Sequence, residues 1–239
     1  LDDQAVADAA PRTTAEIFRQ IPGIRSESTG GDGNANIAVR GLPVASGGAK
    51  FLQLQEDGLP VIQFGDIAFG NADIFLRADQ TVKTIQAVRG GSASTLASNA
   101  PGGVINFVSK DGSQEGGTIM ATLGVDYADY RIDFNYGAKI GENTRFNIGG
   151  FWREGEGPRR AGYNGNSGYQ IKANLTQEFD GGYVRLYAKH LNDRAIGYLP
   201  MPMLVTGSNG DPTFQSIPGF DILADTPHSA LFTSAFGLD

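Results

Sequence analysis

The sequence contains no cysteine in its 239 residues. This absence excludes a disulfide framework and any metal site built on thiolate ligands. Histidine is nearly as scarce, because His190 and His228 are the whole complement and stand far apart. We therefore expect no built-in metal site and no other cofactor.

Long apolar runs and basic clusters are missing as well. No window approaches the roughly 20 consecutive apolar residues of a transmembrane helix, so a membrane location would require strands. The net charge of −7 and the lack of a basic stripe argue against a nucleic-acid partner. Residues 1–13 lack the basic and apolar regions of a signal peptide, so we expect a mature or trimmed chain.

Glycine, by contrast, is abundant, with 34 residues, and it punctuates the run from Val88 to Lys110. The residues before Gly90 suit a strand, residues 92–97 suit a single helical turn, and Gly102-Gly103 precedes a second apolar strand. Turn chemistry alone would explain these glycines. A phosphate-binding loop is not indicated, because no Lys-Ser or Lys-Thr pair follows them at the required spacing.

Four segments, taken in order, resemble one family; they are residues 15–24, 36–42, 54–61 and 88–110. The first is a short helix for which Thr13 and Glu16 fit a capping box. The others fit an I-x-I-R-G strand, a V-x-x-D-G-x-P-V hairpin and a pair of Gly-rich closing strands. Together they resemble the plug domain of TonB-dependent outer-membrane receptors. Gly91 stands where the family usually has proline and Ala97 where it has tyrosine, which indicates a divergent branch.

A different pattern begins at Gly116, where apolar and polar residues alternate. Ile132, Phe134 and Tyr136 share one face of the expected strand, whereas Arg131 and Asp133 share the other. Periodicity alone slightly favours a soluble sandwich. The resemblance favours an outer-membrane barrel, and so do the loop lengths: short turns at 141–144 and 180–182 contrast with long loops at 155–167 and after Arg194.

We therefore expect an α+β plug domain at residues 1–112, followed by antiparallel transmembrane β-barrel strands at residues 113–239. About five strands fit between residues 117 and 194, whereas plugged outer-membrane transporters close with 22 strands. Because five strands cannot enclose a plug, we expect the chain to hold only the beginning of a larger receptor. The family's TonB box is not recognisable, and we expect it ahead of residue 1.

The resemblance implies functional residues of two kinds. The plug signature, which would contact the barrel, comprises Arg40, Gly41, Asp57, Gly58, Arg89, Gly90, Gly102 and Gly103. Of these, Arg40 and Arg89 either pair with carboxylates of the barrel wall or remain solvated at strand ends. A loop that mixes aromatic and hydrogen-bonding groups is the candidate substrate-facing site, although a packed loop has the same composition; its residues are Gln63, Phe64, Asp66, Phe69, Asn71 and Asp73.

No catalytic constellation is present, since Glu56 and Asp57 point to opposite faces of a strand and cannot share a substrate atom; we expect no enzyme. The resemblance implies import of a ferric siderophore, an oligosaccharide or a similar scarce nutrient across the outer membrane of a Gram-negative bacterium. The implied partners are TonB with ExbB and ExbD, outer-membrane lipid, the ligand and a surface lipoprotein. A signalling sensor without transport and a soluble all-β binding module are the alternatives.

Overall fold

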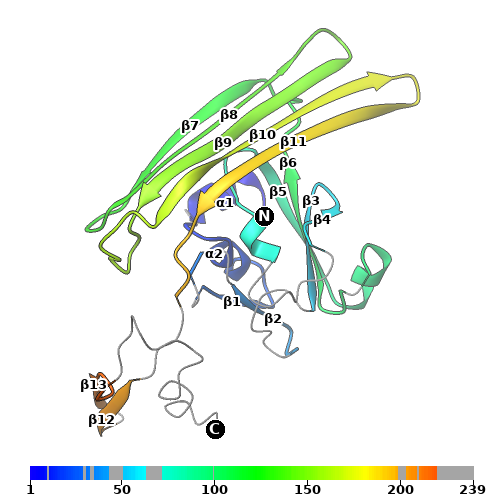
Figure 1. Ribbon diagram of the computed structural model, residues 1–239. Coiled ribbons are helices and arrows are strands. Elements are labelled where there is room, and N and C mark those ends of the chain that lie inside the picture. Colours follow the sequence, from blue (N-terminus) through cyan, green and yellow to red (C-terminus); the bar gives the residue numbers. More distant parts are fainter. Residues whose placement is uncertain are drawn as a thin grey trace. The chain divides into compact units, whose positions relative to one another are not determined.

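The first unit of the chain, Leu1–Gly197, combines a mixed helical and stranded domain with a five-stranded antiparallel array (Figure 1). A second unit covers Tyr198–Asp239. The computed structural model describes residues 1–9, 11–28, 31–32, 35–42, 51–62, 72–98, 100–198, 203–208 and 210–219. No helix within these ranges is long and apolar enough to cross a membrane.

Two short helices open the mixed domain. Helix α1, Asp3–Ala9, was not expected from the sequence; the Asp2 carboxylate caps it by accepting the Ala5 amide proton at 2.8 Å. Helix α2, Thr14–Arg19, confirms the predicted cap, because the Thr13 hydroxyl accepts the Glu16 amide proton at 3.3 Å. The Glu16 carboxylate instead accepts the amide proton of Arg12 at 2.7 Å, one residue before the position of a standard capping box.

A four-stranded sheet with the order β4-β3-β6-β5 forms the body of this domain. Its strands are β3 (Leu52–Glu56), β4 (Leu59–Pro60), β5 (Val82–Arg89) and β6 (Gly103–Ser109). Strands β3 and β6 run parallel, and the other pairs run antiparallel. Two short 3₁₀ helices, η1 (Ala72–Phe75) and η2 (Gly91–Thr95), and the hairpin of β1 (Ile24–Glu27) with β2 (Asn36–Val39) complete it.

The core of the mixed domain lies between α2 and this sheet. Phe18 of α2 is fully buried and meets Phe107 of β6 edge to face, with ring centroids 6.3 Å apart. Leu54, Leu76 and Ile105 are buried in the same cluster. The sequence-predicted segments of the plug resemblance therefore supply one continuous apolar core.

The glycine corner before β6 is required by close backbone packing. Gly103 has φ of +143°, and a Cβ atom there would lie 2.4 Å from the Val88 carbonyl oxygen. A Cβ on Gly102 would lie 2.7 Å from the carbonyl oxygen of Phe51. Both positions thus need glycine for space, and Gly103 also needs it for its dihedral angle.

We expect Gly103→Ala to weaken the β5–β6 pairing by about 1–3 kcal/mol, since it adds a clash to a strained backbone. Hydrogen exchange of the β5 and β6 amides in the full protein measures this loss. Gly91→Ala is the matched control, because no heavy atom lies within 4 Å of the added Cβ. Equal protection in the two variants would contradict the steric account.

The array confirms the expected five strands after the mixed domain. They are β7 (Gly116–Leu123), β8 (Asp129–Lys139), β9 (Thr144–Gly155), β10 (Asn166–Phe179) and β11 (Gly182–Arg194). Each pairs antiparallel with its sequence neighbour. Loops 124–128 and 156–165 join strands at one end of the array, whereas the turns at 140–143 and 180–181 join them at the other.

The two faces of the array differ in polarity, as the alternation predicts. Apolar side chains such as Ile132 and Trp152 are 47% and 45% exposed on the outer face. Asp133, Asn147 and Gln170 lie on the inner face and are buried. An apolar outer surface of this extent calls for lipid or another apolar partner, because soluble monomers rarely expose large contiguous apolar patches.

The second unit corrects one expectation. The sequence predicts a long loop after Arg194, but β12 (Leu204–Ser208) and β13 (Asp211–Gln215) form an antiparallel hairpin there. The pairing brings Val205 opposite Phe214. Cross-strand contact between an aliphatic and an aromatic side chain favours this hairpin, and the long irregular stretch concealed that pattern.

Candidate functional site

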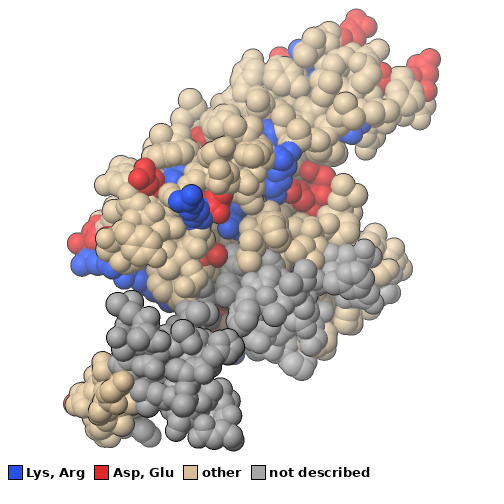
Figure 2. Space-filling model, in the orientation of Figure 1, with Lys and Arg blue, Asp and Glu red and all other residues tan. Residues whose placement is uncertain are grey.

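Charged side chains line the seam where the mixed domain meets the inner face of the array. Figure 2 shows Lys, Arg, Asp and Glu gathered along this line, whereas the outer surface of the array is largely uncharged. Buried charges are costly unless they are paired and hydrogen-bonded. The seam is organised as three groups of such pairs.

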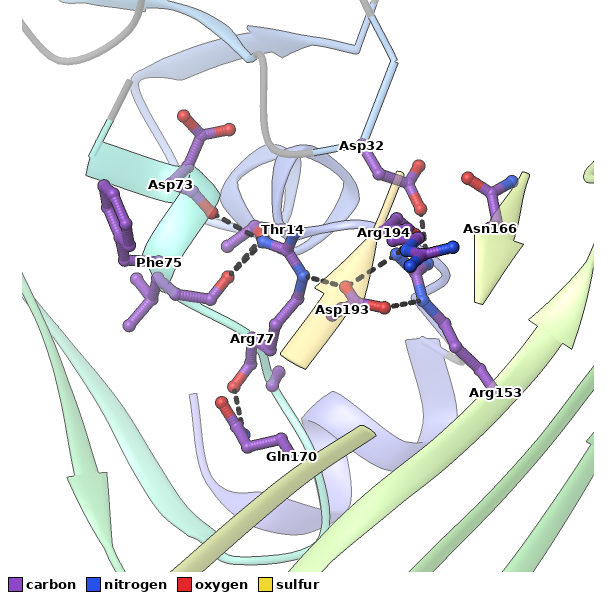
Figure 3. Close-up of polar contacts among 12 residues, drawn as sticks. Thr14, Asp32, Asp73, Phe75, Arg77, Arg153, Asn166, Gln170, Asp193 and Arg194 are labelled. Carbon is purple, nitrogen blue, oxygen red and sulfur yellow. Dashed lines mark hydrogen bonds and ion pairs between the residues drawn. The ribbon is translucent and has the colours of Figure 1, made fainter. Parts of the chain in front are cut away.

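The first group, which we call the Asp193 cluster, joins the two parts of the unit through four buried residues: Asp32, Arg77, Arg153 and Asp193. Arg153 on β9 donates to both carboxylate oxygens of Asp193 on β11, each at 2.7 Å (Figure 3). From the mixed domain, Arg77 donates its Nε hydrogen to Asp193 at 2.8 Å. Arg153 also pairs with Asp32 at 2.6 Å. Asp193 has no exposed side-chain surface, so it depends on both arginines.

Arg77 is held rigidly by further hydrogen bonds. Its Nη1 donates to the main-chain oxygens of Asp73 at 2.8 Å and Leu76 at 3.1 Å. The amide of Gln170, on β10, lies 3.4 Å from the Arg77 carbonyl oxygen and donates to Asp79 at 2.7 Å. Arg131 of β8 donates to the Ala78 carbonyl oxygen at 2.7 Å, so the segment after η1 is fixed to β8, β10 and β11.

The second group centres on Glu56, at the end of β3. One carboxylate oxygen pairs with Lys172 of β10 and the other with Lys189 of β11, each at 2.7 Å. Burial alone would raise the pKa of Glu56, but the two ammonium groups outweigh it and hold the pKa below its usual value. Glu56 is thus an anion bridging two strands of the array.

The third group lies where the mixed domain leads into β7. Asp111 accepts a hydrogen bond from Arg185 of β11 at 2.8 Å and lies 3.4 Å from Arg145 of β9. Partial burial raises the pKa of Asp111, but the Ser113 amide and the two arginines outweigh this and lower it. Lys110 adds a pair with Asp3 at 3.4 Å. Each of the three groups therefore links the mixed domain to strands among β9–β11.

The predicted signature residues lie in the mixed domain. Asp57 and Gly58 have φ of +51° and +83° and form the two-residue turn between β3 and β4, as a hairpin turn of this sequence requires. The Asp57 carboxylate accepts from the amide and hydroxyl of Ser109 at 2.7 Å each. The turn is therefore tied to the end of β6.

The two signature arginines lie near the chain reversal at Pro22-Gly23. The Arg40 amide donates to the Gly23 carbonyl oxygen at 3.1 Å, and the Arg89 guanidinium donates to Pro22. Gly41 and Gly90 adjoin these arginines, with φ of +80° and +89°. The pairing of Arg40 and Arg89 with a barrel carboxylate stays a prediction.

Of the predicted substrate-facing loop, Gln63, Phe64, Asp66, Phe69 and Asn71 lie outside the described residues. Asp73 is described, and its side chain is only 1% exposed. One carboxylate oxygen accepts the Ala35 amide proton at 2.9 Å, and the carboxylate points away from Arg77 (Figure 3). A ligand-binding role for this loop stays a prediction.

Burial raises the pKa of Asp73 to about 6, and the Ala35 hydrogen bond offsets it only in part. A folded-state pKa above the ordinary 3.8 means that folding favours the protonated form. Protonated Asp73 therefore adds about 3 kcal/mol to the free energy of unfolding relative to the ionised form. This contribution is complete below pH 3.8 and is lost as the pH rises through about 6.

We therefore expect the Ala35 amide of the full protein to exchange more readily, after correction for intrinsic rates, as the pH rises from 4 to 7. Asp73→Asn should remove this pH dependence, because an amide does not titrate. Parallel pH profiles for the two proteins would contradict the assignment.

Comparisons with known proteins agree with this geometry. Residues 1–104 match the family of the TonB-dependent Receptor Plug Domain. The chain is 33% identical over 147 residues to the vitamin B12 transporter BtuB of Vibrio cholerae serotype O1, a match that covers 61% of this chain and 23% of the relative. The chain thus spans about a quarter of the length of such curated relatives.

Solved structures show the same fold at low sequence identity. The pyoverdine receptor FpvA of Pseudomonas aeruginosa PAO1, bound to pyoverdine, is 16% identical with a TM-score of 0.64, over 79% of this chain and 26% of FpvA. The siderophore receptor PirA of Acinetobacter baumannii is 18% identical with a TM-score of 0.58, over 79% and 30% of the two chains.

A mixed domain held by charged pairs on the inner face of strands whose outer face is apolar is the arrangement of a plugged outer-membrane barrel. Residues 1–104 thus form a plug domain of the TonB-dependent receptor type, and antiparallel strands follow that are partial relative to a full receptor barrel. These receptors reside in the Gram-negative outer membrane, and the family is non-enzymatic.

Sequence reasoning identified the inward face of the array but not its partners. The alternation places Arg131 and Asp133 on the polar face, where charged groups need water or counter-ions. Arg77 and Asp193 were not singled out, and their contact joins residues 116 positions apart. Asp193 could have been indicated by its position, because it is a charged residue on the inward face of a strand whose outward face is apolar.

Proposed function

We propose that the receptor containing this chain imports a scarce, bulky nutrient across the outer membrane, with energy supplied through TonB, ExbB and ExbD. In this proposal residues 1–112 form the plug and residues 113–239 form the N-terminal portion of the barrel. Lipid surrounds the outer face of β7–β11, and a surface lipoprotein is a further candidate partner.

The charged seam is the observation that supports import best. An apolar interface would hold the plug permanently, because separating it would expose apolar surface to water. Groups such as Glu56 and Lys189 can exchange their ion pairs for hydration when the plug shifts. The seam therefore suits a plug that is held firmly at rest and can still move under an applied force.

The ligand we propose is a metal chelate, such as a ferric siderophore or a corrinoid. The names of the related proteins support this class: BtuB transports vitamin B12, and FpvA and PirA are receptors for pyoverdine and siderophores. An oligosaccharide is the next candidate. We propose that the ligand contacts the loop of Gln63, Phe64, Asp66, Phe69 and Asn71; Asp73, predicted with them, is buried against Ala35 and is left out of this contact.

Uptake by cells that express the full receptor tests this function. The probes are radiolabelled cyanocobalamin, ⁵⁵Fe-loaded catecholate and hydroxamate siderophores, and a labelled maltodextrin. We expect accumulation of one probe that is lost when TonB is deleted, while its binding to the cell surface persists. Surface binding with no accumulation in TonB-containing cells would favour a sensor, and accumulation unchanged by TonB deletion would exclude coupled import.

A further inference from the structure

Contacts between the plug and the array are unevenly distributed. Strands β9, β10 and β11 carry the buried ion pairs of the seam, including those of Asp193 and Glu56. Strand β7 meets the plug differently: in the described part of the chain, the Gln80 amide lies 3.6 Å from the Met120 sulfur. A thioether is a weak hydrogen-bond acceptor, so this contact is easily broken.

Two cavities follow the inner face of β7. One, of about 280 Å³, lies at the beginning of the strand, where Gly116 and Thr118 face Asp3 and Lys110. The other, of about 180 Å³, lies at its end, where Thr122 and Leu123 face Val6 and Ala7 of α1. The same two elements, α1 and β7, therefore line both cavities.

On β7 the Gln80–Met120 contact lies where the lining of the first cavity gives way to that of the second. Both residues line the second cavity, and the preceding inward position on β7, Thr118, lines the first. The neighbouring strand β8 shows the same change of lining, because Asn135 lines the first cavity and Asp133 lines the second. One weak side-chain contact thus borders the second cavity on the side of the first.

We propose that solutes pass the plug along strands β7 and β8, through these two cavities, with Gln80 and Met120 as the partition between them. The proposal rests on the proposed import function and adds the location of the path. Parting Gln80 from Met120 breaks no ion pair, and on β8 the contact to be released is the hydrogen bond that Arg131 donates to the Ala78 carbonyl oxygen at 2.7 Å. A path along β9–β11 would instead break the ion pairs of the Asp193 cluster and of Glu56. The plug can therefore stay docked on β9–β11 while the path opens.

Polar lining supports the passage of hydrated solutes. The first cavity is bordered by Lys83, Lys110 and Asp111, and the second by Arg131 and Asp133. Such groups replace part of the hydration of a polar solute as it moves between plug and wall. An apolar gap of this size would remain dry and would exclude such a solute.

Ion conductance through the purified full receptor in planar lipid bilayers, with KCl as the probe, tests the path without ligand or TonB. We expect the double variant Gln80→Ala, Met120→Ala to raise the current about ten-fold over the unaltered receptor, because it removes both sides of the partition. In that background, the thiol reagent MTSET should block the current after Thr118→Cys or Thr122→Cys. The chain has no native cysteine to interfere.

Thr176→Cys is the matched control, because Thr176 faces inward on β10 with no exposed surface and accepts from Arg185 at 2.5 Å. MTSET should leave the current of this variant unchanged. Should the double variant fold poorly, the single cysteines in the unaltered receptor decide: Thr118→Cys and Thr122→Cys should react about ten-fold faster than Thr176→Cys.

Each of three results would overturn the proposed path. The double variant could conduct no more current than the unaltered receptor, MTSET could block the current through Thr176→Cys, or the three single cysteines could react with MTSET at equal rates. These outcomes are independent of the uptake experiment. If the receptor accumulates its ligand in a TonB-dependent way but the double variant conducts no extra current, import is supported and this path is excluded. If MTSET blocks the current through Thr118→Cys or Thr122→Cys but no probe accumulates in cells, the path is supported and import is excluded.

Discussion

Replacing Asp193 by alanine is expected to loosen the plug from the array more than any other single change. The substitution leaves Arg77 without its ion-pair partner and Arg153 with Asp32 alone, in surroundings where their side chains are less than 10% exposed. Removing one partner of a buried ion pair costs about 3–5 kcal/mol. Hydrogen exchange of residues 72–82 in the full receptor should rise accordingly.

Asp126→Ala is the matched control for this loss. Asp126 also pairs with an arginine, Arg160, but their side chains are 85% and 59% exposed. An exposed pair of this kind contributes at most about 1 kcal/mol. Similar exchange in the Asp126 and Asp193 variants would show that the buried cluster does not hold the plug.

A double-mutant cycle assigns the effect to a specific pair. Arg77→Met removes the plug arginine while keeping apolar volume, and combining it with Asp193→Ala removes both charges together. We expect the double variant to lose less than the sum of the two single variants, because no unpaired charge remains on Arg77. Strict additivity would mean that Arg77 and Asp193 act independently.

Replacing Glu56 by glutamine is the second large effect that we expect. Two lysines of the array, Lys172 and Lys189, share this carboxylate, and the neutral amide leaves two cations facing each other in a partly buried site. We expect the hairpin of β3 and β4 to detach from β10 and β11 at a cost of about 3 kcal/mol. Protease susceptibility of residues 51–62 in the full receptor reports the detachment.

The pH dependence of this hairpin gives an independent check on Glu56. Its folded-state pKa lies below the ordinary value of 4.5, so its contribution is fully present above pH 4.5 and is lost as the pH falls through the lower folded value. Acid should therefore release the hairpin in the unaltered receptor. Glu56→Gln should show no further release, and an acid transition retained in that variant would contradict the assignment.

Much of the fold follows from periodicity and turn chemistry. The alternation of apolar and polar residues around Asp133 and Asn147 predicts which side chains point inward and which point outward, because side chains on a strand alternate between its two faces. The Asp57-Gly58 hairpin and the Gly103 corner follow from backbone angles that few residues adopt. Helix α1 had a signal in Asp2 and Pro11, but seven residues rich in alanine present no apolar stripe that marks a helix.

The charged seam could not be predicted in the same way. Arg77 and Asp193 meet because two separately folded parts are packed together, and no local spacing indicates that contact. The sequence could indicate only that inward charges such as Arg153 needed partners. Asp73 illustrates the same limit, because its burial depends on the packing of η1 against Ala35.

Spin-label accessibility at neighbouring positions of β9 tests most directly that the array is a lipid-facing wall with the plug on its inner side. Single labels are placed through Ile148→Cys, on the outer face, and Asn147→Cys, on the inner face, of the full receptor in lipid bilayers. We predict that the label at 148 collides with oxygen dissolved in lipid, and that the label at 147 is shielded from both oxygen and a water-soluble nickel chelate. Strong collision of the label at 148 with the nickel chelate would place that face in water and contradict the account.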